Sequence, residues 1–246
     1  MSSSDPSGGG AQSGGAQSGG SALASRLNRL RAGVLGANDG IVSVAAVVVG
    51  VAGANAQSSH VITAGAAALI GGAISMAVGE YVSVSSQSDT ERALIEREKR
   101  ELRDTPDDEL DQLTAVYRDR GLSEPTARQV ARELTEHDAL GSHLEAEFAI
   151  SREGVVSPWA AAFTSGIAFV VGSILPMAAI LLPPAAWRVP VTFVTVLIAL
   201  AITGAVAARI SGAPALRAMT RTVLGGALAL GATWAVGLLL DTTGVV

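Results

Sequence analysis

The segment AGVLGANDGIVSVAAVVVGVAGA, residues 32–54, decides the fold of this chain. Asn38 and Asp39 are its only strongly polar residues, and the others are apolar or small. A membrane-spanning helix needs about 20 such residues in a row, because each residue advances the helix by about 1.5 Å and the hydrocarbon core is about 30 Å thick. The segment therefore predicts a transmembrane helix.

Four more runs of this kind follow along the chain, which is 49% apolar and only 16% charged. They lie at about 61–86, 159–182, 189–208 and 222–240. Soluble domains carry about 25% charged residues and rarely hold so many apolar runs of this length. The sequence thus predicts an all-α polytopic membrane protein with five transmembrane helices.

The Lys and Arg residues indicate how these helices are oriented, since such residues accumulate in cytoplasmic loops. With five spans, sixteen of the seventeen lie on one side of the membrane, and only Arg188 lies on the other. We therefore expect the N-terminus and the loop between spans two and three to be cytoplasmic, and the C-terminus to be outside. The preference for Arg over Lys is typical of GC-rich genomes, so we expect an integral protein of a bacterial plasma membrane.

Composition divides the chain into four parts. They are a disordered tail at 1–25, spans one and two in 26–87, an acidic loop at 88–156 and spans three to five in 157–246. Of the 22 acidic residues, 18 lie between Asp89 and Glu153, so the net charge of −5 belongs to the loop and indicates no nucleic-acid partner. Capping signals predict a cytoplasmic three-helix domain there, with helices at about 88–103, 106–120 and 124–150. Its apolar positions are few, so we expect a partner copy or a bound ion to hold its shape.

Two carboxylates lie at membrane depth, Asp39 in the first span and Glu80 near the end of the second. A charge there costs about 2.5–3.5 kcal/mol on insertion scales and usually faces a bundle interior or an aqueous path. Counting about 1.5 Å per residue from the intervening turn places Asp39 level with Met76, and Glu80 one turn further along the same face. Together with Asn38, these side chains form a candidate transport path for a divalent first-row cation. Alternatively, Asp39 caps a helix at the interface and Glu80 is a solvated end residue.

A second group of candidate ligands lies in the acidic loop. Glu91, Glu98 and Glu101 are spaced by seven and three residues, so they project from one side of a helix. The later helices add Glu109, His143 and Glu147. Clustered carboxylates with an occasional His bind divalent ions, although charge-rich helices are often only solvated faces with i,i+4 pairs to Arg. The chain contains no Cys, so thiolate metal sites are excluded.

Three stretches carry a family resemblance. RAGVLGANDGIVSV (31–44), ISMAVGEYVSVSSQSDTERALIEREKREL (74–102) and EHDALGSHLEAE (136–147) resemble the vacuolar iron transporter family. The resemblance implies a five-span homodimer that exchanges cytosolic Fe²⁺ for protons, with a metal-binding domain after span two. It also implies that Asp39, Met76 and Glu80 line the path, and that Glu98, Glu101, Glu109 and Glu147 are metal-domain glutamates. Gln112 stands where a further glutamate is expected, and His143-Leu144 where eukaryotic members carry a Met pair.

We therefore expect proton-coupled transport of Fe²⁺, with Mn²⁺ as a second cargo, out of the cytoplasm. The partners we expect are membrane lipid, protons, divalent metal ions and a second copy of the chain. The loop would bind Fe²⁺, Mn²⁺ or Zn²⁺ as cargo, and no cofactor is expected. No Glu-x-x-His pair, P-loop or Ser-His-Asp set indicates an enzyme. The alternative function is a membrane-anchored divalent-metal-binding or sensing protein that transports nothing.

Overall fold

The computed structural model describes residues 14–54, 57–150 and 157–243, and in these ranges it contains helices and turns but no strand. The chain forms two compact units. We call residues 26–82 with 157–246 the membrane unit, and residues 1–25 with 83–156 the loop unit. The predicted all-α fold is confirmed.

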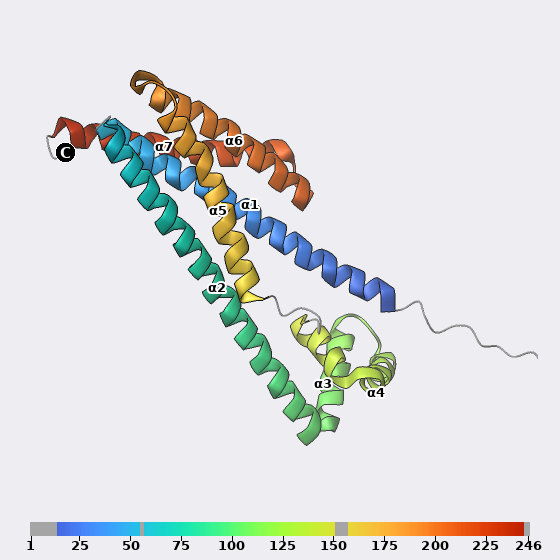
Figure 1. Ribbon diagram of the computed structural model, residues 1–246. Coiled ribbons are helices and arrows are strands. Elements are labelled where there is room, and N and C mark those ends of the chain that lie inside the picture. Colours follow the sequence, from blue (N-terminus) through green and yellow to red (C-terminus); the bar gives the residue numbers. More distant parts are fainter. Residues whose placement is uncertain (1–13, 55–56, 151–156, 244–246) are drawn as a thin grey trace, which may run out of the picture. The chain divides into compact units, whose positions relative to one another are not determined.

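The helices of the membrane unit agree with the predicted spans (Figure 1). They are α1 (Gly14–Ala54), α2 (Ser58–Asp104), α5 (Pro158–Leu181), α6 (Arg188–Ser211) and α7 (Ala215–Thr242), with a short 3₁₀ turn η1 (Ala185–Trp187) before α6. Within the described residues, five helices are long and apolar enough to cross a membrane, so the predicted number of spans is confirmed. Helix α1 begins at Gly14, inside the predicted tail, whereas residues 1–13 lie outside the described part.

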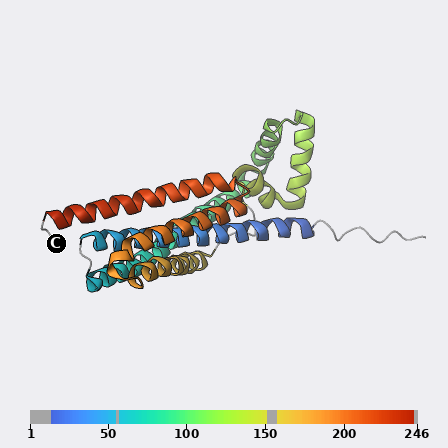
Figure 2. The ribbon, with the colours of Figure 1, turned by 90° about the horizontal axis from the view of Figure 1, so that it is seen from above.

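The core of the membrane unit is built around α1, which buries two of its faces. Ile41, Ala45 and Val49 are spaced by four residues and pack against α6 and α7, which lie side by side in Figure 2. Val44 and Val48 lie on another face and pack in a second cluster, which includes residues of α2 and α5. Helix α1 therefore holds the membrane unit together, and its polar residues sit on the central element.

Glycines let α1 approach α5 closely. A Cβ atom added at Gly40 would meet the carbonyl oxygen of Phe169, and one at Gly172 would meet the carbonyl oxygen of Ala37. Ser173 in α5 donates to the carbonyl of Gly40 at 3.4 Å. Small residues at such crossings are the usual way in which membrane helices gain packing contacts. The backbone that carries Asp39 is therefore fixed against α5 on both sides of this residue.

The loop unit contains the end of α2 together with α3 (Pro106–Asp119) and α4 (Glu124–Phe148). Helices α3 and α4 pack against each other, with Leu113 and Ala131 fully buried. Gly121 follows α3 with a φ of 101°, a conformation that favours glycine. Helix α4 is not regular, because Asp138 has the non-helical angles φ −159° and ψ 84°.

Candidate metal centre

Four ligating side chains from three helices of the loop unit converge on one point. They are Glu98 from α2, Glu109 from the first turn of α3, and His143 and Glu147 from α4. One ligand atom from each lies within 4.8 Å of those of the others. The Nδ1 atom of His143 is 3.0 Å from Glu98, 3.1 Å from Glu147 and 3.5 Å from Glu109. This arrangement surrounds one imidazole with three carboxylates.

The group, which we call the loop cluster, is shielded from water. His143 and Glu98 keep only 0% and 1% of their surface exposed. A neutral imidazole carries one ring proton, so Nδ1 satisfies at most one of the three carboxylates, and its hydrogen bond goes to Glu147. Glu98 Oε1, Glu109 Oε2 and His143 Nε2 have no hydrogen-bond partner among the described residues. Buried polar atoms without partners are costly, so the loop cluster is suited to a cation or to added protons.

The electrostatics of the loop cluster favour proton uptake when no cation is bound. Burial raises the pKa of Glu98 from 4.5 to about 7, and the like charges of Glu147, Glu109 and Glu101 add to the effect. Burial also raises the pKa of Glu109, although the nearby His143 opposes that rise. Protons and a divalent cation would therefore compete for the same carboxylates near neutral pH.

Gln112 hydrogen-bonds to one of the candidate ligands. Its side-chain nitrogen donates to Glu147 Oε2 at 2.6 Å, while the other oxygen of Glu147 faces His143. Outer hydrogen bonds of this kind fix the direction in which a ligand presents its lone pairs. Gln112 stands where the family resemblance predicts a further glutamate, and here it contacts a candidate ligand.

Two predicted loop ligands lie apart from the cluster. Glu101 accepts a hydrogen bond from Arg97 at 2.9 Å, and Glu91 accepts one from Gln87 at 2.9 Å. Both contacts are i,i+4 pairs along α2, the pattern expected of a solvated helix face. The structure thus brings together Glu98, Glu109, His143 and Glu147 but not Glu91 or Glu101.

The four candidate residues of the transport path are all in the membrane unit. Asp39 is half-buried and accepts a hydrogen bond from Ser43 at 2.9 Å, while Asn38 accepts one from Thr203 of α6 at 3.1 Å. Met76 packs at the edge of the core cluster shared by α1, α2 and α5, and Glu80 is half-buried. Among the described residues, no hydrogen bond or ion pair joins Asp39 to Glu80. The structure therefore places these four residues in the membrane unit without joining them in one ligand set.

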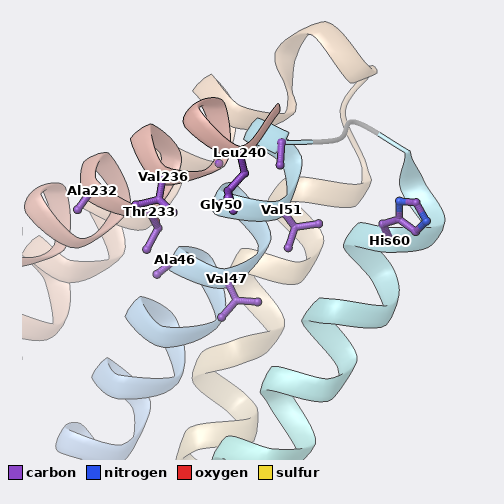
Figure 3. A pocket seen from close by; sticks show the side chains of 11 residues that line it. Ala46, Val47, Gly50, Val51, His60, Ala232, Thr233, Val236 and Leu240 are labelled. Atoms are coloured by element: carbon purple, nitrogen blue, oxygen red, sulfur yellow. The ribbon is translucent and has the colours of Figure 1, made fainter. Parts of the chain in front are cut away.

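A separate hollow of about 660 Å³ lies between α1 and α7. Figure 3 shows Val47 and Val51 of α1, Val236 and Leu240 of α7 and His60 of α2 along its wall. Its lining contains no carboxylate among the described residues. With one imidazole and no carboxylate among these residues, the hollow does not offer the set of charged ligands found in the loop cluster.

Comparison with known proteins gives a consistent result. The sequence model of the VIT family matches residues 30–238. A protein of Acanthamoeba castellanii named "Vacuolar iron transporter" is 44% identical over 88% of this chain and 80% of its own length. "Vacuolar iron transporter homolog 2" of Oryza sativa is 35% identical over 86% of this chain and 90% of its own. "Vacuolar iron transporter 1" of Tulipa gesneriana is 29% identical over 82% and 83%, respectively.

Proposed function

Because the chain belongs to the VIT family, we propose that it exports Fe²⁺ from the cytoplasm in exchange for protons. Transport of metal ions and an integral membrane location follow from the family and from the apolar helices. The names of the curated relatives support iron as the cargo, with Mn²⁺ as a second candidate. The direction of transport and the use of protons are the further steps of the proposal.

The loop cluster is the observation that carries this proposal. Its three carboxylates attract a cation, and its imidazole favours first-row transition ions over Ca²⁺ and Mg²⁺. The Lys and Arg distribution favours a cytoplasmic position for this loop, so the cluster would take up Fe²⁺ from the cytoplasm. A bound ion would be partnered by Glu98 Oε1 and Glu109 Oε2, which otherwise lack hydrogen bonds.

The membrane step would use the carboxylates of α1 and α2. Asp39 and Glu80, with the thioether of Met76 and the amide of Asn38, would bind the ion after it loses water. Protons entering from outside would neutralise the carboxylates and release the ion. The Ser43 hydrogen bond to Asp39 and the close packing of α1 on α5 support a fixed position for the first of these ligands.

A proteoliposome assay tests the proposal. Purified protein is reconstituted, and uptake of Fe²⁺ is followed with and without a proton gradient. We expect Fe²⁺ flux in the wild type and a loss of at least about tenfold in Asp39→Ala. The flux should be faster when protons flow down their gradient in the direction opposite to the movement of Fe²⁺. Glu96→Ala is the matched control, because this exposed carboxylate pairs with Lys99 on the solvated face of α2.

The outcomes separate the two functions that the sequence leaves open. Undiminished flux in Asp39→Ala would exclude the assigned path. Metal binding by the loop cluster with no flux of any of Fe²⁺, Mn²⁺, Co²⁺ or Zn²⁺ would favour the metal-binding or sensing protein instead.

A further inference from the structure

Helix α4 consists of two helical halves, and the second half carries both of its candidate ligands. The break is at Asp138, whose backbone is extended, with φ −159° and ψ 84°. Extended backbone of this kind is the normal conformation of a residue that caps the N-terminus of a helix. His143 and Glu147 follow the break by five and nine residues.

Asp138 makes the hydrogen bond of such a cap. Its Oδ1 accepts from the backbone N–H of Gly141 at 3.1 Å, which is the bond from a cap to the third residue of a new helix. A Cβ atom at residue 141 would meet the Asp138 carboxylate, so a larger residue there would push this carboxylate out of its capping position. The Ser142 hydroxyl donates across the break to the carbonyl of Leu134 at 3.2 Å. Specific hydrogen bonds therefore stabilise the break in α4.

The break changes which residues of α4 face inward. Ala127 and Ala131 define the buried face of the first half. At about 100° per residue, an unbroken helix would continue that face through Glu145 and Ala149, and would turn His143 about 140° away from its middle. The structure shows the opposite, since His143 is buried and both Glu145 and Ala149 are exposed. The change of face at Asp138 is what allows His143 to enter the loop cluster.

We propose that Asp138 is a positioning residue of the metal centre: by capping a second half-helix it turns His143 and Glu147 toward Glu98 and Glu109. The inference rests on the proposed function, because it assumes that the loop cluster takes up a divalent cation. Asp138 would act on the ion through its cap, which sets the direction of the second half-helix.

Titration of the full-length protein in detergent with Co²⁺ tests this role. Asp138→Ala removes the cap, and we expect it to weaken Co²⁺ binding about 10- to 100-fold, as is usual for residues that orient metal ligands. Asp138→Asn and Asp138→Ser keep a capping oxygen and should stay within about threefold of the wild type. Glu136→Ala is the matched control, because it removes one exposed carboxylate from the same helix.

A double-substitution cycle gives a second readout. If Asp138 works by placing His143, then His143→Ala should weaken binding strongly in the wild type but by less than about threefold in Asp138→Ala. Gly141→Ala keeps Asp138 but obstructs its carboxylate, and it should lose affinity in the same way as Asp138→Ala. This variant also serves if Asp138→Ala does not fold.

Three results would overturn the inference. The first is an unchanged Co²⁺ affinity in Asp138→Ala and Gly141→Ala. The second is a Co²⁺ affinity in Asp138→Asn and Asp138→Ser as low as that expected for Asp138→Ala. The third is that the losses of Co²⁺ affinity caused by Asp138→Ala and His143→Ala add fully in the double variant. Absence of Co²⁺ binding to the wild type would instead refute the loop cluster as an ion site, which is a failure of the proposed function.

Discussion

Glu98 lies almost without solvent contact beside two other carboxylates, and this environment sets a pH dependence. Its pKa is raised from 4.5 to about 7 in the folded protein, so between these values the folded state holds a proton that the unfolded chain releases. The resulting stabilisation of the folded state is complete below 4.5, the ordinary pKa of the group, and it is lost as the pH rises through about 7, the pKa of Glu98 in the folded protein. Glu109 acts in the same direction, because its pKa is also raised.

We therefore expect the melting temperature of the metal-free loop unit within the full protein to fall between about pH 5 and about pH 8. A bound divalent cation should remove most of this fall, because it replaces the proton as the partner of Glu98. Thermal unfolding at several pH values, with and without Co²⁺, measures both effects. Glu98→Gln should flatten the metal-free curve, and a melting temperature that rises across this range would contradict the assignment.

Gln112 offers a test of the charge of the loop cluster. Gln112→Glu places a fourth carboxylate at hydrogen-bond distance from Glu147, so we expect lower stability of the metal-free protein and about tenfold tighter Co²⁺ binding. Calorimetric titration and thermal unfolding measure the two effects. Gln129→Glu is the control, since Gln129 also donates to a glutamate, Glu133, but on an exposed face of α4. Equal changes in both variants would show that the effect is not specific to the cluster.

At the scale of the helices, the crossing of α1 and α5 depends on Gly40. A methyl group there would meet the backbone of Phe169, so Gly40→Ala should destabilise the membrane unit by about 1–3 kcal/mol and reduce transport. Gly33→Ala, in the same helix but with nothing within 4 Å, should be neutral or stabilising by up to about 1 kcal/mol. Thermal unfolding in detergent and the flux assay report the difference. Equal behaviour of the two variants would argue against the tight crossing.

The helices could be predicted from the sequence, because spans and caps are local signals. The apolar run at 32–54 coincides with the candidate span Ala32–Ala54, which is the C-terminal part of α1, and Pro106 and Gly121 mark the two ends of α3. The break at Asp138 was not predicted, since the apolar pattern of α4 continues across it. An Asp followed three residues later by Gly141 is the signal that could have indicated a second cap.

The candidate site was only partly predictable for a similar reason. Spacing places Glu98 and Glu101 on one side of α2, but it does not tell which of them faces α3 and α4. Packing decides this: Glu98 is buried beside His143, whereas Glu101 pairs with Arg97. Neighbours in space therefore separate a ligand from a surface charge where the sequence cannot.

At the scale of the whole molecule, the homodimer remains a prediction, and α2 is where it is best tested. Only 11% of the apolar window of α2 is buried, against 39% for α1 and α5. Small exposed residues repeat every four positions along it, at Ala67, Gly71, Ser75 and Gly79. Such a row of small residues forms a shallow groove that allows close approach of a second helix, so we expect the α2 helices of two copies to pack together.

The natural chain has no cysteine, so a single introduced thiol gives an unambiguous result. Gly71→Cys should form an oxidised dimer in membranes within minutes of adding an oxidant. Gly225→Cys on α7 is the control, because Gly225 is also exposed with nothing within 4 Å, yet it should not crosslink. Equal crosslinking at both positions, or none at Gly71, would count against an α2 interface.

The donor atoms of the loop cluster have one more consequence, which concerns iron and peroxide. Peroxide oxidises cysteine thiolates to sulfenic and higher acids and the methionine thioether to a sulfoxide. The candidate ligands of the loop cluster are three carboxylates and one imidazole, and they include no sulfur atom. The sulfur of Met76 is the candidate ligand that peroxide would convert to a sulfoxide. Conversion of methionine to its sulfoxide should therefore impair passage of the ion through the membrane while it leaves the ligands of the loop cluster unchanged.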